Sequence, residues 1–492
     1  MKRNDMTNYT HRYLARIVIE AETPLSIGSG EKDLVTDSLV ATDSNGLPYI
    51  PATSIAGVVR SMMKSLCTNE GEESGKDIVE SLFGFQGSGK NSDKGKGSEI
   101  IFTEAKILDS QGNVMDGLCD MDRISSDSLL QHYAALPVRQ HVRITDKGTA
   151  ADQKLFSGQV VFAGSRFCFE IEMVSDGSNF TLFESVLSRL RDVSFRLGGG
   201  TRDGFGKIRV VEMKTADLDL LKKESLDAYL AKSSSLDSLF WKEHGHETEN
   251  MSMTPTASKS MIHYRLELRP ESFFQFGSGY SDDEADMTPV KAKKVEWTET
   301  DSRVTGTLID NLVLIPATSL KGALAHRVAF HWNRLSSKYA DDMKGTDFEK
   351  ITGSHNEAVR LLFGSEGDEH DMTRGNVIFS DIIQGKAKDK IFNHLKIDRF
   401  TGGGIEGALF SEKAVYGEGD CYTTEILLDK KNLFSSCGEE GSPEAERVIE
   451  TFEKALEDLC NGMLSLGGGV NRGHGVFNGT LVIVNDNEHE EN

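Results

Sequence analysis

The sequence reads Leu197-Gly198-Gly199-Gly200-Thr201-Arg202-Asp203-Gly204-Phe205-Gly206 in its first half and Leu466-Gly467-Gly468-Gly469-Val470-Asn471-Arg472-Gly473-His474-Gly475 near its end. A second pair of stretches keeps the same order, because Ile50-Pro51-Ala52-Thr53-Ser54 returns as Ile315-Pro316-Ala317-Thr318-Ser319. A period of this length corresponds to a whole domain and not to a short solenoid unit. The chain is therefore predicted to contain two copies of one domain.

Both halves show the same order of expected elements. An alternating apolar pattern opens each half, around residues 15–21 and 264–268, and predicts a strand. A helix with one apolar stripe follows each Ile-Pro pair, and a second amphipathic helix precedes each glycine-rich segment and a last strand. This order is typical of ferredoxin-like or RRM-like folds. The sequence predicts two tandem α+β domains of this class, with long insertions.

A polar stretch separates the two halves. Residues 243–259 are rich in Thr, Ser, Glu and His and have almost no apolar periodicity. The 492 residues are too many for one ordinary core. We expect a first domain over residues 1–242, a linker over 243–259 and a second domain over 260–492.

Composition limits the compartment and the class of protein. The six cysteines form no CxxC pair, which argues against zinc ribbons and against a disulfide framework. No apolar run approaches the length of a membrane span, and the first residues lack the apolar segment of a signal peptide. We expect a soluble, cytoplasmic protein with no membrane partner.

The formal net charge of −22 argues at first against nucleic acid, because phosphate binding depends on Lys and Arg. Local clusters of basic residues qualify this argument. A solvated face explains most such clusters, and a path for RNA is the alternative. The clusters contain Arg139, His141, Arg143, Lys147 and Lys154 in the first half, and Lys291, Lys293 and Lys294 in the second.

The two glycine-rich segments are candidate phosphate contacts. Clustered glycines let backbone N–H groups approach an anion closely, and Arg202 and Arg472 would add positive charge. The alternative is that the glycines only permit a tight connection between a helix and a strand.

Taken together, these motifs resemble the RAMP superfamily, and in particular the backbone subunits of type III CRISPR effector complexes. Residues 48–57 and 314–322 resemble the family pattern PYIPxSSxxG. Residues 467–475 match the pattern GGGxxRGxG, and residues 198–206 resemble it with the arginine one position earlier. The resemblance covers nearly the whole chain and looks most like the tandem-fused subunits of the type III-D branch. It implies guide CRISPR RNA, target RNA, other RAMP subunits, a large polymerase-like subunit and a small helical subunit as partners.

The resemblance implies that each domain binds guide RNA through two segments. These are the first turn of the helix after its Ile-Pro pair and its glycine-rich loop. The resemblance also implies a β-hairpin thumb that displaces one nucleotide of the guide–target duplex, with residues 147–153 and 401–407 as candidates, although flexible loops are the alternative. The family lysine is present as Lys321 but is Ala56 in the first domain. The residues implied in RNA binding are Ser54, Arg60, Arg139, Arg143, Gly199, Gly200 and Arg202 in the first domain, and Ser319, Lys321, Lys396, Gly468, Gly469 and Arg472 in the second.

In the family, an aspartate in the loop after the first strand cuts target RNA. The pattern falls on Asp37, with Asp33 as the second choice, and on Asp286 in the second domain. The loop at residues 281–290 reads as longer and more acidic, which leaves the register of Asp286 open. A carboxylate there could hold a divalent metal ion such as Mg²⁺, with unknown further ligands, or accept a proton from the 2′-OH of a splayed RNA linkage.

Three other functions were weighed. Residues 84–91 nearly match the GxxxxGK[ST] phosphate loop, but Asn91 lacks the hydroxyl group that holds Mg²⁺ and no apolar helix follows, so nucleotide hydrolysis is not expected. A structural guide-binding subunit without cleavage stays open. A stand-alone RAMP endonuclease that processes guide precursors stays open as well.

Overall fold

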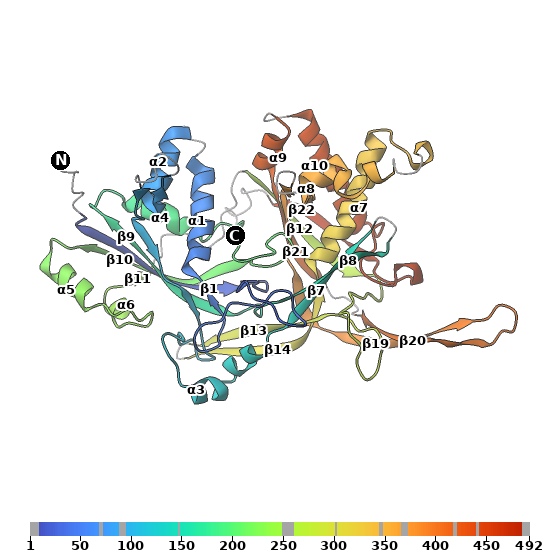
Figure 1. Cartoon of the computed structure of the whole chain (residues 1–492), viewed down its shortest axis with the longest axis horizontal. Coiled ribbons are helices and arrows are strands. Elements are labelled where there is room, and N and C mark those ends of the chain that lie inside the picture. Colours follow the sequence, from blue (N-terminus) through green and yellow to red (C-terminus); the bar gives the residue numbers. More distant parts are fainter. Residues whose placement is uncertain are drawn as a thin grey trace.

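The computed structural model describes residues 9–67, 72–87, 95–145, 148–247, 260–300, 303–343, 348–365, 372–416, 421–438 and 442–484. Figure 1 shows two α+β domains that lie side by side along the long axis of the molecule, each with helices stacked on a sheet. None of the helices in these ranges is long and apolar enough to cross a membrane.

The first domain is built on one antiparallel sheet. Its strands lie in the order β11-β10-β1-β9-β6-β2, and β5 also pairs with β9. α1 (Ala52–Cys67) follows β1, and α4 (Phe180–Arg189) connects β9 to β10. The strands are β1 (His11–Ala21), β2 (Tyr49–Ile50), β5 (Ile100–Phe102), β6 (Ala105–Ile107), β9 (Arg166–Ser175), β10 (Ile208–Asp219) and β11 (His246–Glu247).

The second domain repeats this topology. Its sheet has the order β17-β21-β12-β22, with α7 (Ala317–Leu335) after β12 and α10 (Pro443–Cys460) between β21 and β22. In both domains the last strand pairs with the first, and the first with the third, as in a ferredoxin-like fold. The predicted fold class is confirmed. The strands are β12 (Met261–Pro270), β17 (Val377–Ile378), β21 (Tyr422–Asp429) and β22 (Phe477–Val484).

The burial of β1 explains why an apolar run forms the centre of the first sheet. Tyr13, Ile17 and Ile19 lie in the core beneath the helices, whereas Leu14 and Val18 belong to smaller apolar clusters on the other face. Each such side chain contributes roughly 1.5–3 kcal/mol when it is fully buried. β1 therefore has two apolar faces, and both are covered because it lies in the middle of the sheet.

The remaining helices and short strands lie in the connections between these strands or after the last long strand of the first domain. In the first domain they are α2 (Glu72–Phe83), β3 (Phe85–Gln86), β4 (Gly95–Lys96), α3 (Met121–Ser126), the 3-10 helix η2 (Leu130–Ala134), α5 (Lys223–Ala231) and α6 (Phe240–Glu243). In the second they are η3 (Ala340–Asp342), η5 (Glu349–Ile351), η6 (Gly353–His355), α8 (Glu357–Phe363), β15 (Gly364–Ser365), β16 (Thr373–Arg374), β18 (Ile382–Lys386), α9 (Lys430–Ser436) and η7 (Val470–Arg472). The expected linker begins at the end of α6 and includes β11, and its residues 248–259 lie outside the described residues.

Each domain inserts one long hairpin before its third strand. β7 (Val138–Ile144) pairs with β8 (Ala150–Gln159), and β19 (Lys388–Ile397) pairs with β20 (Gly404–Tyr416). The hairpin β19–β20 extends well beyond the body of the protein (Figure 1). The two thumb candidates fall at the tips of these hairpins, although Lys147 lies outside the described residues.

A third hairpin joins the domains. β13 (Lys291–Thr300) and β14 (Arg303–Ile315) belong to the second half of the chain, yet Val295 is buried in the core of the first domain. The N–H of Val295 donates to the carbonyl oxygen of Ala163 at 2.8 Å, and the Trp297 indole donates to that of Gly164 at 2.7 Å. Gly164 has φ +81°, and a Cβ there would lie 1.9 Å from the Val295 oxygen. Only glycine fits this crossing.

Candidate nucleic-acid interface and cleavage site

The loop between β1 and α1 holds Asp37 against the base of the hairpin β7–β8. The Asp37 Oδ2 atom accepts hydrogen bonds from the Ser157 backbone N–H at 2.8 Å and from the Ser157 hydroxyl at 3.1 Å. In return, the Asp37 N–H donates to the Ser157 carbonyl at 3.1 Å. Asp37 is exposed, and Oδ1 accepts no hydrogen bond from the described residues. One carboxylate oxygen is therefore fixed and the other is available.

The second domain repeats this arrangement with Asp286 and Ser411. Asp286 Oδ2 accepts from the Ser411 N–H at 2.8 Å and from its hydroxyl at 2.9 Å, and the Asp286 N–H donates to the Ser411 carbonyl at 3.1 Å. The Ser411 backbone and hydroxyl bonds, in that order, lower the pKa of Asp286. We call Asp37 with Ser157 and Asp286 with Ser411 the two aspartate–serine pairs.

The same turn sets the register of both loops. Asp33 Oδ1 accepts from the N–H groups of Val35 and Thr36 at 2.7 and 2.6 Å. These bonds lower the pKa of Asp33. Asp282 Oδ1 accepts from the residues two and three positions on, at 3.0 and 2.9 Å. The second loop is thus more acidic but not longer, which corrects the sequence reading, and Asp286 corresponds to Asp37. Asp33, the second choice for the catalytic aspartate, uses one carboxylate oxygen to hold this turn.

Sequence reasoning missed the serines. Ser157 and Ser411 end the repeated Leu-Phe-Ser stretches, which were visible in the sequence as a match between the halves but carried no role. Each hairpin also stacks a histidine on the phenylalanine before the serine. The ring centroids of His141 and Phe156 lie 4.8 Å apart, and a second such stack follows in the second domain.

The glycine loops are tied to their own domains. The Gly199 N–H donates to the Ser26 carbonyl at 2.6 Å, and the Gly468 N–H donates to that of Gln275 at 2.7 Å. These two N–H groups are therefore already used within the fold, which favours the tight-turn interpretation at these positions. Gly200 lies over Phe205, and Gly469 lies over His474.

Three predicted RNA-binding residues lie at the junction between the domains. Arg139 donates to Asp381 at 2.9 Å, and the two side chains are 10% and 2% exposed. Burial lowers the pKa of Arg139 and raises that of Asp381. Arg202 donates to the Gly375 carbonyl, and burial lowers the pKa of Arg202 to about 10. Lys321 Nζ lies 2.7 Å from Asp203 Oδ1. These cations hold the domains together.

At the junction, the glycine loop of the first domain packs against the first turn of α7 in the second domain. Asp381 Oδ1 accepts from the N–H of Ala317, the first residue of α7, at 2.8 Å. Gly204 has φ +107°, and a Cβ there would lie 2.5 Å from both the Ala317 Cβ and Asp381 Oδ1. No sequence signal distinguished this buried glycine from the exposed ones.

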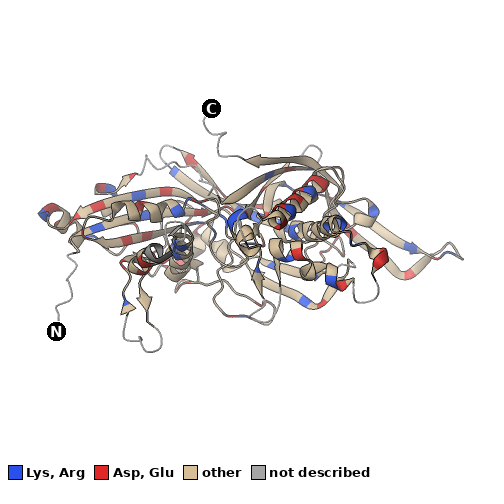
Figure 2. Ribbon diagram, turned by 90° about the horizontal axis from the view of Figure 1, so that it is seen from above, with Lys and Arg blue, Asp and Glu red and all other residues tan. Residues whose placement is uncertain are grey.

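The other predicted RNA-binding residues are more accessible. Arg60, Arg143 and Lys396 are exposed, and Ser54 and Ser319 are partly exposed in the first turns of α1 and α7. Lys and Arg alternate with Asp and Glu over the described parts of both domains (Figure 2).

Arg472 pairs with Glu412, whose side chain is fully buried. His394 Nε2 also lies 3.0 Å from Glu412 Oε1. Arg472 and Arg202 are not equivalent, because Asp203 occupies the position of Arg472 in the first glycine loop. The two loops therefore carry their arginines in different places.

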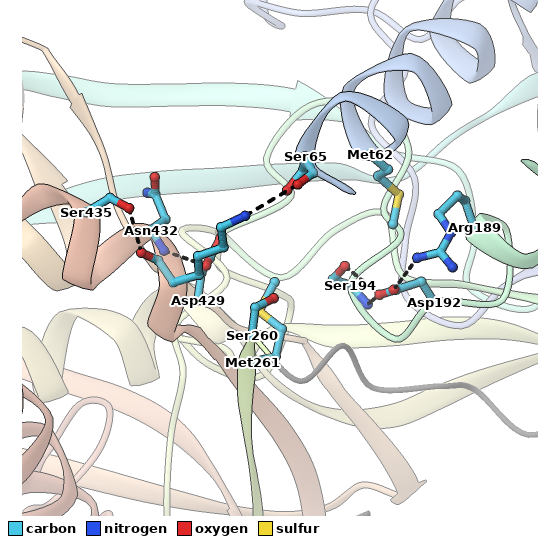
Figure 3. Close-up of a pocket in the computed structure, with 11 residues that line it drawn as sticks. Met62, Ser65, Arg189, Asp192, Ser194, Ser260, Met261, Asp429, Asn432 and Ser435 are labelled. Atoms are coloured by element: carbon cyan, nitrogen blue, oxygen red, sulfur yellow. Dashed lines mark hydrogen bonds and ion pairs between the residues drawn. The ribbon is translucent and has the colours of Figure 1, made fainter. Parts of the chain in front are cut away.

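A polar cavity of about 290 Å³ lies between the domains, on the side of α1 and α9 (Figure 3). Its wall includes Met62, Asn432 and the pair Arg189 and Asp192, whose charged atoms lie 3.7 Å apart. None of the predicted RNA-binding residues lines it. The aspartate–serine pairs remain the better candidates for chemistry.

Asp37 and Asp286 are the candidate ligands for a metal ion. Within the described ranges, no group of three His, Cys, Asp or Glu side chains could hold a metal ion. Mg²⁺ usually keeps several waters and takes one or two carboxylates, so a single free oxygen of Asp37 or Asp286 fits such an ion.

The chain has the architecture of a tandem ferredoxin-like protein with a loop aspartate beside a hairpin in each domain. The family model of the RAMP superfamily matches residues 18–209 and 298–478, and the chain belongs to this superfamily. No curated protein matches it. Membership indicates a CRISPR-associated, RNA-binding protein that works with RNA and other Cas subunits.

Proposed function

We propose that the chain is a guide-RNA-binding backbone subunit of a type III CRISPR ribonucleoprotein complex, of the III-D kind, and that it cleaves guide-paired target RNA. The observation that carries this proposal is the pair of matching aspartate–serine arrangements at the bases of two hairpins. The proposed partners are guide RNA, target RNA, other RAMP subunits, a large polymerase-like subunit and a small helical subunit.

The proposed reaction is attack of the RNA 2′-OH on its own phosphate. The bond from O2′ to phosphorus forms, the bond from phosphorus to O5′ breaks, and the leaving oxygen takes a proton from water. Ser157 or Ser411 fixes one oxygen of the aspartate, and the other oxygen accepts the 2′-OH proton and later releases it to water. If a divalent ion were bound instead, the free oxygen would hold it, the ion would stabilise the phosphate charge, and water would take the 2′-OH proton. Displacement of one nucleotide by the hairpin would bring the 2′-OH in line with the phosphate.

A structural subunit without cleavage is the second candidate. In this candidate, the hydrogen bonds of the Asp37 and Asp286 carboxylates to Ser157 and Ser411 would serve only to tie each loop to its hairpin. Assembly with the partner subunits and a labelled target separates the two candidates. Cuts at one or two regularly spaced positions support cleavage, whereas an intact target supports the structural subunit.

RNA binding can be tested on the purified full chain. We expect it to bind single-stranded RNA, with affinity that falls as salt rises, because phosphate contacts release counterions. Arg60→Ala or Lys396→Ala should weaken binding to unrelated sequences alike and should reduce the slope of log K against log salt by about 0.7 per lost contact. Fluorescence anisotropy measures both quantities.

Lys64→Ala is the matched control for this experiment, because Lys64 is an exposed lysine in the last turn of α1, the helix that carries Arg60. It should leave binding unchanged. Affinity that does not respond to salt would count against a phosphate path, and a loss limited to one sequence would indicate base recognition.

The serines can be tested one domain at a time. Ser157→Ala should slow the first cut roughly tenfold, because the lost hydroxyl hydrogen bond of about 1–1.5 kcal/mol leaves Asp37 less well positioned. Ser411→Ala should slow only the second. Single-turnover mapping of the cut ends measures both rates in one complex. Ser→Thr keeps the hydroxyl and should restore most of the rate, and equal slowing of both cuts by either variant would contradict local positioning.

A further inference from the structure

The two acidic loops share one backbone frame but differ at the tip. Leu34 and Val35 stand between the turn aspartate and Asp37, whereas Asp283 and Glu284 stand at the same places before Asp286. The turn hydrogen bonds of Asp33 and Asp282 establish this equivalence. We call Leu34 with Val35 the first tip, and Asp283 with Glu284 the second tip.

The first tip is an exposed apolar pair beside the held carboxylate. Leu34 is 104% exposed and Val35 is 78% exposed. The Val35 carbonyl accepts from the Ser157 hydroxyl at 3.1 Å, so the tip adjoins the serine that fixes Asp37. Leu155, two residues before Ser157 on β8, is exposed as well, but so is Leu409 at the matching place before Ser411. On the hairpin side the two sites are therefore alike, and the tips differ.

The second tip is charged. Glu284 lies 2.7 Å from Lys413 Nζ, and Lys413 also pairs with Asp282. One positive charge is therefore shared by two carboxylates. Asp283 is exposed beside them. Carboxylates close to an RNA linkage would repel its phosphates, and salt would screen this repulsion.

We propose that the first tip packs against the base of the target nucleotide at the first cut, and that the second tip lacks this contact and repels the RNA backbone there. The apolar face of an unpaired base suits two aliphatic side chains, whereas two carboxylates would have to be desolvated against it. This inference rests on the proposed cleavage function and adds that the two sites are unequal. The first site cuts faster than the second.

A reciprocal exchange of the tips tests the inference in the complete guide-loaded complex. Leu34→Asp with Val35→Glu should slow the first cut by roughly threefold to tenfold, and Asp283→Leu with Glu284→Val should speed the second by a similar factor. In the unmodified chain, higher salt should reduce the difference in rate between the two cuts, because it screens the repulsion at the second tip. The tips are exposed, so the thermal midpoint of each variant should stay that of the unmodified chain.

A second measurement does not depend on cleavage. Target RNA that carries 4-thiouridine near each expected cut is crosslinked to the complex, and the labelled peptides are mapped. Crosslinks to residues 34–35 that exceed those to 283–284 support the inference even if no cut occurs, in which case only the cleavage proposal fails. Equal crosslinking at the two tips, or exchanged tips that leave both cut rates unchanged, would overturn the inference while leaving the cleavage proposal intact.

Discussion

Asp37→Ala is expected to abolish one cut in the target RNA and to leave guide and target binding almost unchanged. The carboxylate acts on the reacting linkage, whose proton transfer is worth about 10²- to 10⁴-fold in rate. Its negative charge adds no attraction to RNA phosphates, and within the fold its fixed oxygen is bound by Ser157, so its loss should not weaken binding. Sequencing the ends of a labelled target measures each cut separately.

Asp286→Ala in the same complex is the matched control, since it should remove the other cut alone. Asp37→Asn is a finer test, because the amide keeps the shape of the side chain and removes the charge. The double variant should bind target and leave it intact. Cleavage that persists at every position in the double variant would eliminate both aspartates as catalytic residues.

Arg139→Ala is expected to destabilise the junction between the domains by about 3–5 kcal/mol, because it leaves the buried carboxylate of Asp381 without its partner. The same carboxylate accepts from the first residue of α7, so the start of this helix should loosen as well. Denaturant unfolding and limited proteolysis of the full chain measure the loss of stability and the opening of the junction.

The matched control for Arg139→Ala is a substitution of Glu104, the counterpart of Asp381 in the first domain. Glu104 occupies the position of Asp381 in the first domain, where its half-exposed side chain pairs with Lys106 at 2.9 Å. Glu104→Gln should cost less than about 1 kcal/mol. Arg139→Met with Asp381→Leu removes both charges and should be less harmful than Arg139→Ala alone. Equal losses for Arg139→Ala and Glu104→Gln would show that the buried pair does not hold the junction.

The fold was largely predictable because its signals are local. Alternating strands, one-sided helices and repeated glycine segments recur in the same order, and they define the ferredoxin-like topology twice. The crossing of β13–β14 was not predictable. The apolar side chains of Val295 and Trp297 indicate a buried face of the hairpin. The local sequence does not indicate that this face packs on the other domain.

The positions of the two candidate aspartates were predictable for the same reason. A motif located Asp37 and Asp286, and the structure gives both the same hydrogen-bonded serine partner, although their loop tips differ. The serines lie more than a hundred residues away in the sequence, so only the fold brings them to the aspartates. The positive charge of Arg139 and Arg202 suggested RNA, but charge alone does not reveal whether a side chain is buried against another domain.

The β13–β14 hairpin holds the two halves of the chain in one relative position. Because a strand from the second half completes the core of the first domain, the two halves cannot slide or rotate past each other without exposing Val295 and Trp297 to water. The separation of the two aspartate–serine pairs is then a property of the protein. Under the proposed function, the interval between the two cuts would stay constant from one target sequence to the next, since both sites belong to one chain whose halves share a core.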